Sequence, residues 1–304
     1  MERKTVPMLW TLLAGFAVLS WTIDAKWAAA AVTPSSDGTS IHYEVTGEGE
    51  PTLVLIHGWS CDATYWREQI APFAASHRVV TVDLAGHGAS GLERSDYTMA
   101  AFGADVVAVL AVEGIDGAVL VGHSMGGPVA VETALAAPQR VRGLIGIDNF
   151  QDLHATLTAE QIAGFAGAME ADFAGTVVPW VRGMFPADAD SALVGQVAAD
   201  MAAAPQAVGI SAISHTLAWM GGGGVARLPL LTVSLTTISG DRHPTDVEGN
   251  RALVPGFAVR LMTDTGHFPM LEKPEAFNAL LAEAVAEFAD AALVPGAPVG
   301  PRLD

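Results

Sequence analysis

Ser124 is the residue of this chain whose setting most directly suggests chemistry. It lies at the centre of the segment GHSMG, residues 122–126, which follows a short apolar run at 117–121 and precedes a run to about Ala137 that is typical of a helix. A G-x-S-x-G segment between a strand and a helix makes a sharp turn, and the serine at its tip is strained with its hydroxyl exposed. Glycine is needed on both sides because the turn leaves no room for side chains. The sequence therefore predicts that Ser124 is a nucleophile.

A serine hydroxyl becomes a good nucleophile only when a base takes its proton. Among the nine histidines, His267 has the right setting, because its segment TGHFP, residues 265–269, lies between the last expected strand and the last expected helix. The order nucleophile, acid, histidine along the chain is a known order for this kind of site. We therefore expect His267 to be the general base for Ser124.

Two backbone N–H groups are needed to bind the negative charge that develops on a substrate carbonyl oxygen. One should come from Met125, because it follows the nucleophile at the start of the expected helix. The other should come from the loop after an earlier strand, where the segment HGW, residues 57–59, makes the Trp59 N–H the expected donor. Gly58 would let the backbone approach the substrate closely.

Four ordered motifs together resemble those of the α/β-hydrolase fold superfamily. They are HGW at 57–59, DLAGHGAS at 83–90, GHSMGG at 122–127 and GH at 266–267, and the resemblance extends from about residue 38 to 289. It implies an eight-stranded, mostly parallel sheet with helices on both faces, a helical cap and a serine nucleophile. It says little about the substrate, because one fold hosts many functions.

The sequence leaves open which residue is the acid of the expected Ser-His-Asp triad. The resemblance places the acid three residues after the glycine that ends the seventh strand, but here the residue three after Gly240 is His243. Asp148 follows the apolar run 141–147, and some members of the superfamily carry their acid at the end of this earlier strand. Asp241 lies next to the usual position and could reach the histidine through a shifted loop. We expect Asp148 to be the acid and keep Asp241 as the alternative.

Apolar runs alternate with segments of helical periodicity along much of the chain. This alternation predicts the α/β class, with a parallel sheet covered by helices on both faces. The expected strands are 41–45, 52–56, 78–82, 118–121, 141–147, 230–239 and 257–262, and the expected helices are 64–75, 99–112, 128–137 and 275–292.

The pattern changes between residues 150 and 228, which look helical, are rich in alanine and large apolar residues, and end in four glycines at 221–224 that should form a flexible break. We therefore divide the chain into a first part of the α/β-hydrolase core, a helical cap, a second part of the core and a disordered tail. Their bounds are 31–149, 150–228, 229–292 and 293–304. Apolar cap helices would suit a lid over a small hydrophobic substrate.

The start of the chain is expected to export the protein. A short basic segment with Arg3 and Lys4 precedes an almost wholly apolar run from Val6 to Ile23, and small residues then offer a cleavage site. This pattern is typical of a secretory signal peptide, residues 1–30. An uncleaved N-terminal membrane anchor is the alternative, because the run is nearly long enough to span a bilayer. We expect a periplasmic or secreted protein, or one anchored to the membrane by this segment.

Composition and residue spacing argue against a nucleic-acid partner, an intramolecular disulfide and a metal site. The chain has 33 acidic and 15 basic residues and a net charge of −18, so nucleic acid is not an expected partner. The single cysteine, Cys61, cannot form an intramolecular disulfide. His243 beside Asp241 lacks a third ligand at a suitable spacing, so we expect neither a metal nor another cofactor. The sequence does not indicate an oligomeric state.

These observations favour a serine hydrolase that cleaves an ester or a related acyl compound through an acyl-enzyme on Ser124. Perhydrolysis of the haloperoxidase type, acyl transfer and carbon–carbon bond hydrolysis use similar sites on this fold and remain alternatives. Dehalogenases and epoxide hydrolases are disfavoured, because they normally carry aspartate at the position of Ser124. A non-catalytic protein that binds a ligand under the cap is the remaining alternative.

Overall fold

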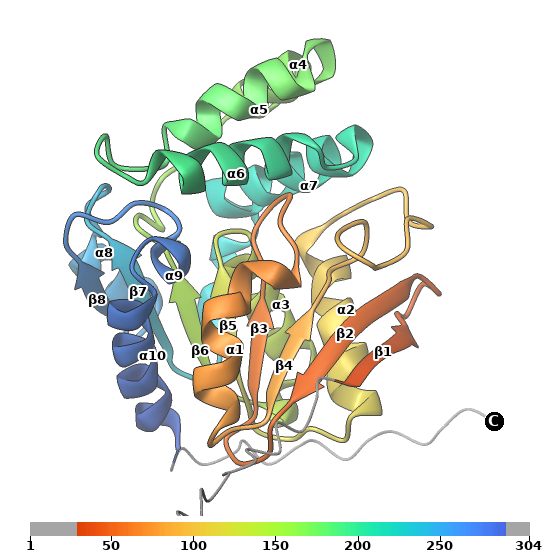
Figure 1. Ribbon diagram of the computed structural model, residues 1–304, viewed down its shortest axis with the longest axis vertical. Coiled ribbons are helices and arrows are strands. Elements are labelled where there is room, and N and C mark those ends of the chain that lie inside the picture. Colours follow the sequence, from red (N-terminus) through yellow and green to blue (C-terminus); the bar gives the residue numbers. More distant parts are fainter. Residues whose placement is uncertain (1–28, 290–304) are drawn as a thin grey trace, which may run out of the picture.

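The structure is a computed structural model, and it describes residues 29–289. Its centre is an eight-stranded sheet in the order β1-β2-β4-β3-β5-β6-β7-β8 (Figure 1). The first two strands run antiparallel to their neighbours, and the pairs from β4 to β8 are parallel. This arrangement confirms the predicted fold class, a mostly parallel α/β sheet of the α/β-hydrolase type.

The strands are β1 (Ala29–Pro34), β2 (Ser40–Thr46), β3 (Leu53–Ile56), β4 (Val79–Val82), β5 (Ala118–His123), β6 (Val141–Ile147), β7 (Leu235–Gly240) and β8 (Ala258–Met262). The α-helices are α1 (Arg67–Ala74), α2 (Met99–Val112), α3 (Gly126–Ala136), α4 (Ala159–Ala171), α5 (Phe173–Arg182), α6 (Ser191–Ala202), α7 (Gln206–Ala218), α8 (Val247–Leu253), α9 (Pro269–Glu272) and α10 (Pro274–Phe288). Short helical turns are η1 (Ala63–Trp66), η2 (Pro138–Arg140), η3 (Trp219–Gly223) and η4 (Val225–Leu230).

The central strands are continuous apolar runs because both faces of the sheet are covered. Every residue of β3, β4 and β5 is buried. Helices α1 and α10 lie on one face of the sheet, and α2 and α3 lie on the other (Figure 1). Strands buried on both faces need β-branched and other apolar side chains at every position, and this explains why they lack the alternation of a half-exposed strand.

Parallel pairing brings the carboxyl ends of the central strands to one edge of the sheet. Ile56 in β3 pairs with Gly122 in β5, which in turn pairs with Gly146 in β6. Ile147 at the end of β6 pairs with Ile238 in β7. The segments that follow β3, β5, β6 and β7 therefore meet at the same edge, where open parallel sheets place their ligands.

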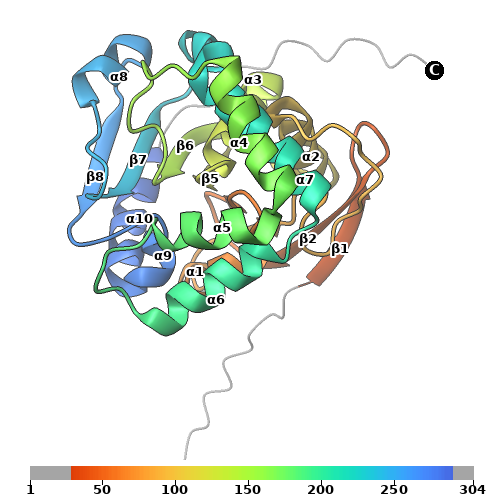
Figure 2. The same ribbon diagram turned by 90° about the horizontal axis from the view of Figure 1, so that it is seen from above.

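Four helices, α4 to α7, lie over this edge of the sheet (Figures 1 and 2). We call them the cap helices. Three of them begin with a side chain that accepts a backbone N–H: Thr158 for α4, Asp172 for α5 and Asp190 for α6. These N-caps satisfy N–H groups that a helix start leaves without partners, and they fix the boundaries of an insertion between β6 and β7.

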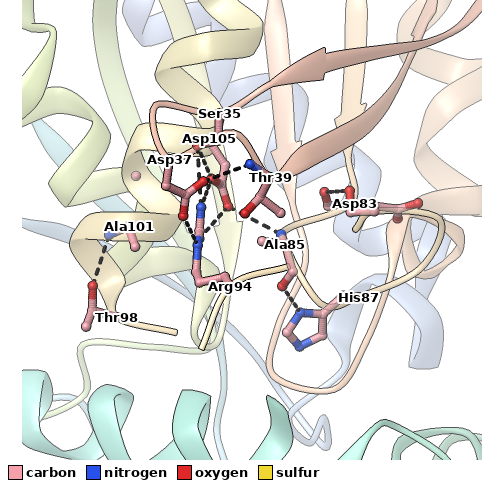
Figure 3. A network of polar contacts seen from close by, with 12 residues as sticks. Ser35, Asp37, Thr39, Asp83, Ala85, His87, Arg94, Thr98, Ala101 and Asp105 are labelled. Atoms are coloured by element: carbon pink, nitrogen blue, oxygen red, sulfur yellow. Dashed lines mark hydrogen bonds and ion pairs between the residues drawn. The ribbon is translucent and has the colours of Figure 1, made fainter. Parts of the chain in front are cut away.

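A buried ion-pair network fixes the loop after β4 (Figure 3). The Arg94 guanidinium donates to the Asp105 carboxylate of α2 at 2.5 and 3.0 Å, and to Asp37 between β1 and β2 at 2.7 Å. Asp105 also accepts the Ser35 hydroxyl at 2.5 Å. Arg94 and Asp105 are buried, so each charge depends on the other for its stability.

The structure differs from the predicted elements in several places, and helix α8 is one element that was not predicted. Strand β1 was not predicted, and it includes Ala29 and Ala30, which the signal-peptide interpretation assigned to the leader. The glycines at 221–224 were expected to form a flexible break, but most of them belong to η3, a π-helical turn in which Gly222 has a φ of 126°. The strand predicted at 230–239 is shorter at its start, because β7 begins at Leu235 and residues 225–230 form the helical turn η4.

Two predictions fall mainly on residues that the structure does not describe. The signal peptide or anchor at 1–30 lies outside the described residues except for its last two, and the tail at 293–304 lies wholly outside them. Within 29–289, no helix is both long enough and apolar enough to span a membrane.

Candidate active site

Ser124 lies at the turn between β5 and α3 with a φ of 51°. This is the left-handed region, which is strained for a residue with a side chain. The flanking glycines are required by space, because a Cβ at Gly122 would collide with the Gly126 backbone, and one at Gly126 would collide with the Ile56 carbonyl. The local geometry agrees with the sharp turn that the sequence predicts, and the Ser124 residue stays partly accessible to solvent.

Asn149 supports the Ser124 turn, and the sequence analysis did not identify it. Its Nδ2 donates to the Gly122 carbonyl at 2.8 Å and to the Ser124 carbonyl at 3.2 Å. The side chain is buried against the small residues of the turn, since a Cβ at Gly127 would collide with it. Its only sequence signal is weak, because an Asp-Asn pair after β6 is equally typical of a turn or a helix N-cap.

The structure brings Asp148 and His267 together. His267 Nδ1 lies 2.6 Å from Asp148 Oδ2, so the Nδ1–H donates to the carboxylate. The other carboxylate oxygen, Oδ1, accepts the Gly240 N–H at 3.0 Å. Asp148 is buried and has a φ of 47°, and its own N–H donates to the Ile238 carbonyl at 2.9 Å. Both oxygens of the acid are therefore held by strand β7 and the histidine loop.

Asp241 lies close by but does not contact His267. Its carboxylate accepts the N–H groups of Asp264 at 3.0 Å and Thr265 at 3.3 Å. These two backbone N–H groups lower the pKa of Asp241, whose side chain is exposed. Asp241 thus holds the loop that leads to His267, whereas Asp148 holds the imidazole itself. Of the two candidate acids, the geometry of a triad fits Asp148.

Four contacts hold the His267 loop in place. The His267 N–H donates to the Met184 carbonyl in the loop after α5 at 3.1 Å, and His123 Nε2 donates to the His267 carbonyl at 2.8 Å. Glu272 accepts the N–H groups of Gly266 and Phe268, each at 2.9 Å. Burial raises the pKa of Glu272. Neither His123 nor Glu272 was given a role at this loop by the sequence analysis, because both contacts depend on how segments far apart fold together.

The two expected oxyanion donors lie on either side of Ser124. Met125 directly precedes α3, and a Cβ at Gly58 would lie 3.2 Å from Ser124 Cβ, so the loop that carries Trp59 is in close contact with Ser124. Neither the Trp59 N–H nor the Met125 N–H is taken up by an acceptor within the described part of the chain.

The cap helices cover this loop with aromatic side chains. The Trp59 ring lies 6.1 Å from Phe173 and 5.3 Å from Trp180, both on α5. Trp59 Nε1 also donates to the Gly209 carbonyl of α7 at 2.7 Å. Such an apolar roof excludes water and strengthens hydrogen bonds beneath it.

The other polar candidates do not add a second reactive group. Cys61 is buried, its thiol donates to the Trp59 carbonyl at 3.3 Å, and burial raises its pKa, so it stays protonated and unreactive. In the described part of the chain, no three His, Cys, Asp or Glu side chains gather in a way that could hold a metal ion. His243 is exposed and lies outside the site.

Comparison with known proteins agrees with this fold. The alpha/beta hydrolase family matches residues 53–280 of the chain. An N-acyl homoserine lactone degrading enzyme, Est816, has a similar solved structure, with 29% identity and a TM-score of 0.69 over 82% of this chain and 98% of that one.

Two curated relatives carry names of different reactions. The dihydrolipoyllysine-residue acetyltransferase component of the acetoin cleaving system of Cupriavidus necator is 31% identical over 84% of this chain and 68% of that protein. A pimeloyl-acyl-carrier-protein methyl ester esterase of Pectobacterium carotovorum is 32% identical over 45% of this chain and 54% of that esterase. The family match covers most of the chain, and its residues include the expected nucleophile, acid and base. The chain belongs to the alpha/beta hydrolase family.

Proposed function

We propose that the protein hydrolyses a carboxylic ester or a related acyl substrate through an acyl-enzyme on Ser124. The observation that carries the proposal is the 2.6 Å contact of His267 Nδ1 with Asp148 Oδ2, in a loop fixed beside the strained Ser124 turn. A histidine oriented by a buried carboxylate is the base that a serine nucleophile requires.

In the proposed reaction, the Ser124 hydroxyl attacks the substrate carbonyl carbon while His267 Nε2 takes the hydroxyl proton. The N–H groups of Trp59 and Met125 bind the oxygen as it becomes negative, an interaction worth several kcal/mol in other enzymes. His267 then gives the proton to the leaving alcohol, and the C–O bond breaks. A water molecule, deprotonated by the same imidazole, attacks the acyl-enzyme and releases the carboxylic acid.

The charges around His267 support this role. Asp148 is buried, and its carboxylate accepts one hydrogen bond from the Gly240 N–H and one from the imidazole, so it lies where it can stabilise the imidazolium that forms during the reaction. The neighbouring rings of His57 and His123 are buried, and burial lowers the pKa of each, so both stay neutral. Of the three histidines His57, His123 and His267, we therefore expect His267 to take the proton of the Ser124 hydroxyl.

The surroundings favour an apolar acyl group of small or medium size. The cap helices present Phe173 and Trp180 above Trp59, and an apolar lining with a few fixed hydrogen-bond donors is typical of small-molecule sites. Relatives named as a methyl ester esterase and an acyl lactone degrading enzyme are compatible with this class, because a lactone is a cyclic ester.

Acyl transfer is the second candidate. The chain is 31% identical to a protein named as an acetyltransferase component over 84% of its length. The same acyl-enzyme would then pass its acyl group to an alcohol, amine or thiol in place of water. The two reactions share every step up to the acyl-enzyme, so they differ only in which acceptor reaches Ser124 under the cap.

A fluorophosphonate probe tests the proposal without knowledge of the substrate, because it labels only an activated serine. We expect the purified protein to be labelled, and the label to be lost in Ser124→Ala but kept in Ser214→Ala, a serine on α7 that hydrogen-bonds to the Ile210 carbonyl. A p-nitrophenyl ester series from acetate to octanoate then gives kcat/KM against chain length. A folded protein that is neither labelled nor active on these esters would contradict the proposal.

A further inference from the structure

A surface pocket of about 230 Å³ lies beside the loop that carries Trp59. Its walls come from the segment after β3, the loop after β4 and the C-terminal end of α6. Ser60 and His87 form part of its buried floor, and Gly88 and Asp200 lie exposed at its rim. A cavity of about 150 Å³ holds benzene in another protein, so this pocket has room for a molecule of several non-hydrogen atoms.

Two polar atoms in the floor of this pocket have no hydrogen-bond partner among residues 29–289. They are Ser60 Oγ and His87 Nε2, on side chains of residues that are 5% and 4% exposed. Leaving one such buried group unpaired costs about 1–3 kcal/mol. Two such acceptors beside one pocket could pair with a ligand that brings hydrogen-bond donors.

The His87 ring presents a lone pair at Nε2. Its other nitrogen, Nδ1, lies 3.0 Å from the Ala85 carbonyl oxygen (Figure 3), and because a carbonyl can only accept, Nδ1 carries the proton. Burial, and after it the neighbouring His57, lowers the pKa of His87 to about 3, so the ring stays neutral. A ligand must therefore bring a hydrogen-bond donor to Nε2.

The charges around the pocket favour a positively charged donor. Asp62 and Asp200 line the pocket, and none of the lining residues is lysine or arginine. Among the described residues, each carboxylate accepts hydrogen bonds from a neighbour through one oxygen only, Asp62 Oδ1 from Thr64 and Asp200 Oδ2 from the Tyr65 hydroxyl. Helix α6 ends at Ala202, and the next residues, Ala203 and Ala204, also line the pocket. The C-terminal end of a helix carries partial negative charge, which adds to the attraction for a cation and repels a carboxylate or phosphate.

We propose that this pocket binds a small primary ammonium group. Its N–H donors pair with His87 Nε2 and Ser60 Oγ, and its charge faces Asp62 and Asp200. The site is separate from the proposed catalytic residues, but Ser60 directly follows Trp59. An occupied pocket therefore holds the backbone that presents the Trp59 N–H to the substrate.

Ethanolamine is a suitable probe, because it is small and carries a primary ammonium group. We expect titration into the full-length protein with ¹⁵N-labelled histidine to shift the His87 Nε2 resonance, which is assigned by its loss in His87→Gln. The shift should saturate with a Kd of about 1–10 mM, a reasonable affinity for a probe with only four non-hydrogen atoms. Propionate and sodium chloride at equal ionic strength should leave the resonance in place.

Two variants separate this site from a general effect of charge. Ser60→Ala removes one acceptor and should weaken ethanolamine binding about five-fold or more. Ser214→Ala on α7 lies outside this pocket and should bind as the parent does. The proposal is overturned if ethanolamine causes no saturable shift, if propionate causes the same shift, or if both serine variants bind equally.

Turnover of a neutral ester distinguishes two sources of the ammonium group. Competitive inhibition by ethanolamine would show that the group belongs to the substrate, and a change in kcat without competition would show a separate small ligand. The resonance shift does not depend on catalysis, so failure of the proposed hydrolase function would leave this test intact.

Discussion

Replacing Asp148 with asparagine tests the assignment of the acid most directly. In the structure, Oδ1 accepts the Gly240 N–H at 3.0 Å and Oδ2 accepts the His267 Nδ1–H at 2.6 Å. An asparagine has only one oxygen, and the Gly240 N–H is a fixed donor that requires it. The new NH₂ group must then face His267, where it donates to Nδ1 and moves the imidazole proton to Nε2. That tautomer cannot accept the proton of Ser124.

The expected loss follows from this change of tautomer. The equivalent substitution in a well-studied serine protease lowers kcat by about 10⁴-fold, and a loss of about 10³- to 10⁴-fold here corresponds to about 4–5.5 kcal/mol of transition-state stabilisation. The assay is kcat/KM on the best p-nitrophenyl ester, with the active fraction counted by the fluorophosphonate probe. Circular dichroism and Tm should show that the variant remains folded.

Asp241→Asn is the matched control for Asp148→Asn. Asp241 is exposed and accepts only backbone N–H groups from Asp264 and Thr265. An asparagine oxygen can keep one of these bonds, so we expect activity to fall by no more than about ten-fold, because substitutions of exposed side chains usually change the free energy of unfolding by only about 0.5 kcal/mol. A larger loss in Asp241→Asn than in Asp148→Asn would refute the reasoning.

Three further changes probe the framework of the site. Asn149→Ala removes the bonds to the turn at Ser124 and should lower the free energy of unfolding by about 1–3 kcal/mol in urea. It should also lower kcat of the protein that remains folded, and an unchanged kcat would contradict a role in positioning. Asp105→Asn leaves the buried Arg94 charge poorly paired and should cost about 3–5 kcal/mol, and a loss below about 1 kcal/mol would show that the pair adds little. Burial lowers the pKa of His87 to about 3 in the folded protein, so unfolding takes up a proton when the pH is below the normal pKa of a histidine. His87 should therefore lower the free energy of unfolding by about 1–2 kcal/mol from pH 6.5 to 5. His87→Gln should flatten this slope, and an equal slope in that variant would contradict the reasoning.

Some elements follow from the local sequence pattern, and others form only through contacts in the folded chain. Strand 141–147 and helix 99–112 have the predicted bounds, because their apolar patterns are long and uninterrupted. Strand β1 was missed because its alanines look like the end of a leader, and only pairing with β2 makes them a strand. The glycines at 221–224 look like a break, yet the π-helical turn η3 forms there, with the Trp219 indole N–H held by Glu132 at 2.8 Å.

The sequence by itself predicted which residues of this chain could carry out chemistry. A serine between glycines at a strand-to-helix turn and a histidine near the C-terminal end are local signals, because strain and turn geometry depend on adjacent residues. Only the tertiary structure shows that Asp148, and not Asp241, contacts His267. Both follow strands whose carboxyl ends meet at one edge of the sheet, and which carboxylate faces His267 depends on the register of β6 against β7. Contacts between strands 90 residues apart leave no periodicity in a single sequence, so packing alone can settle them.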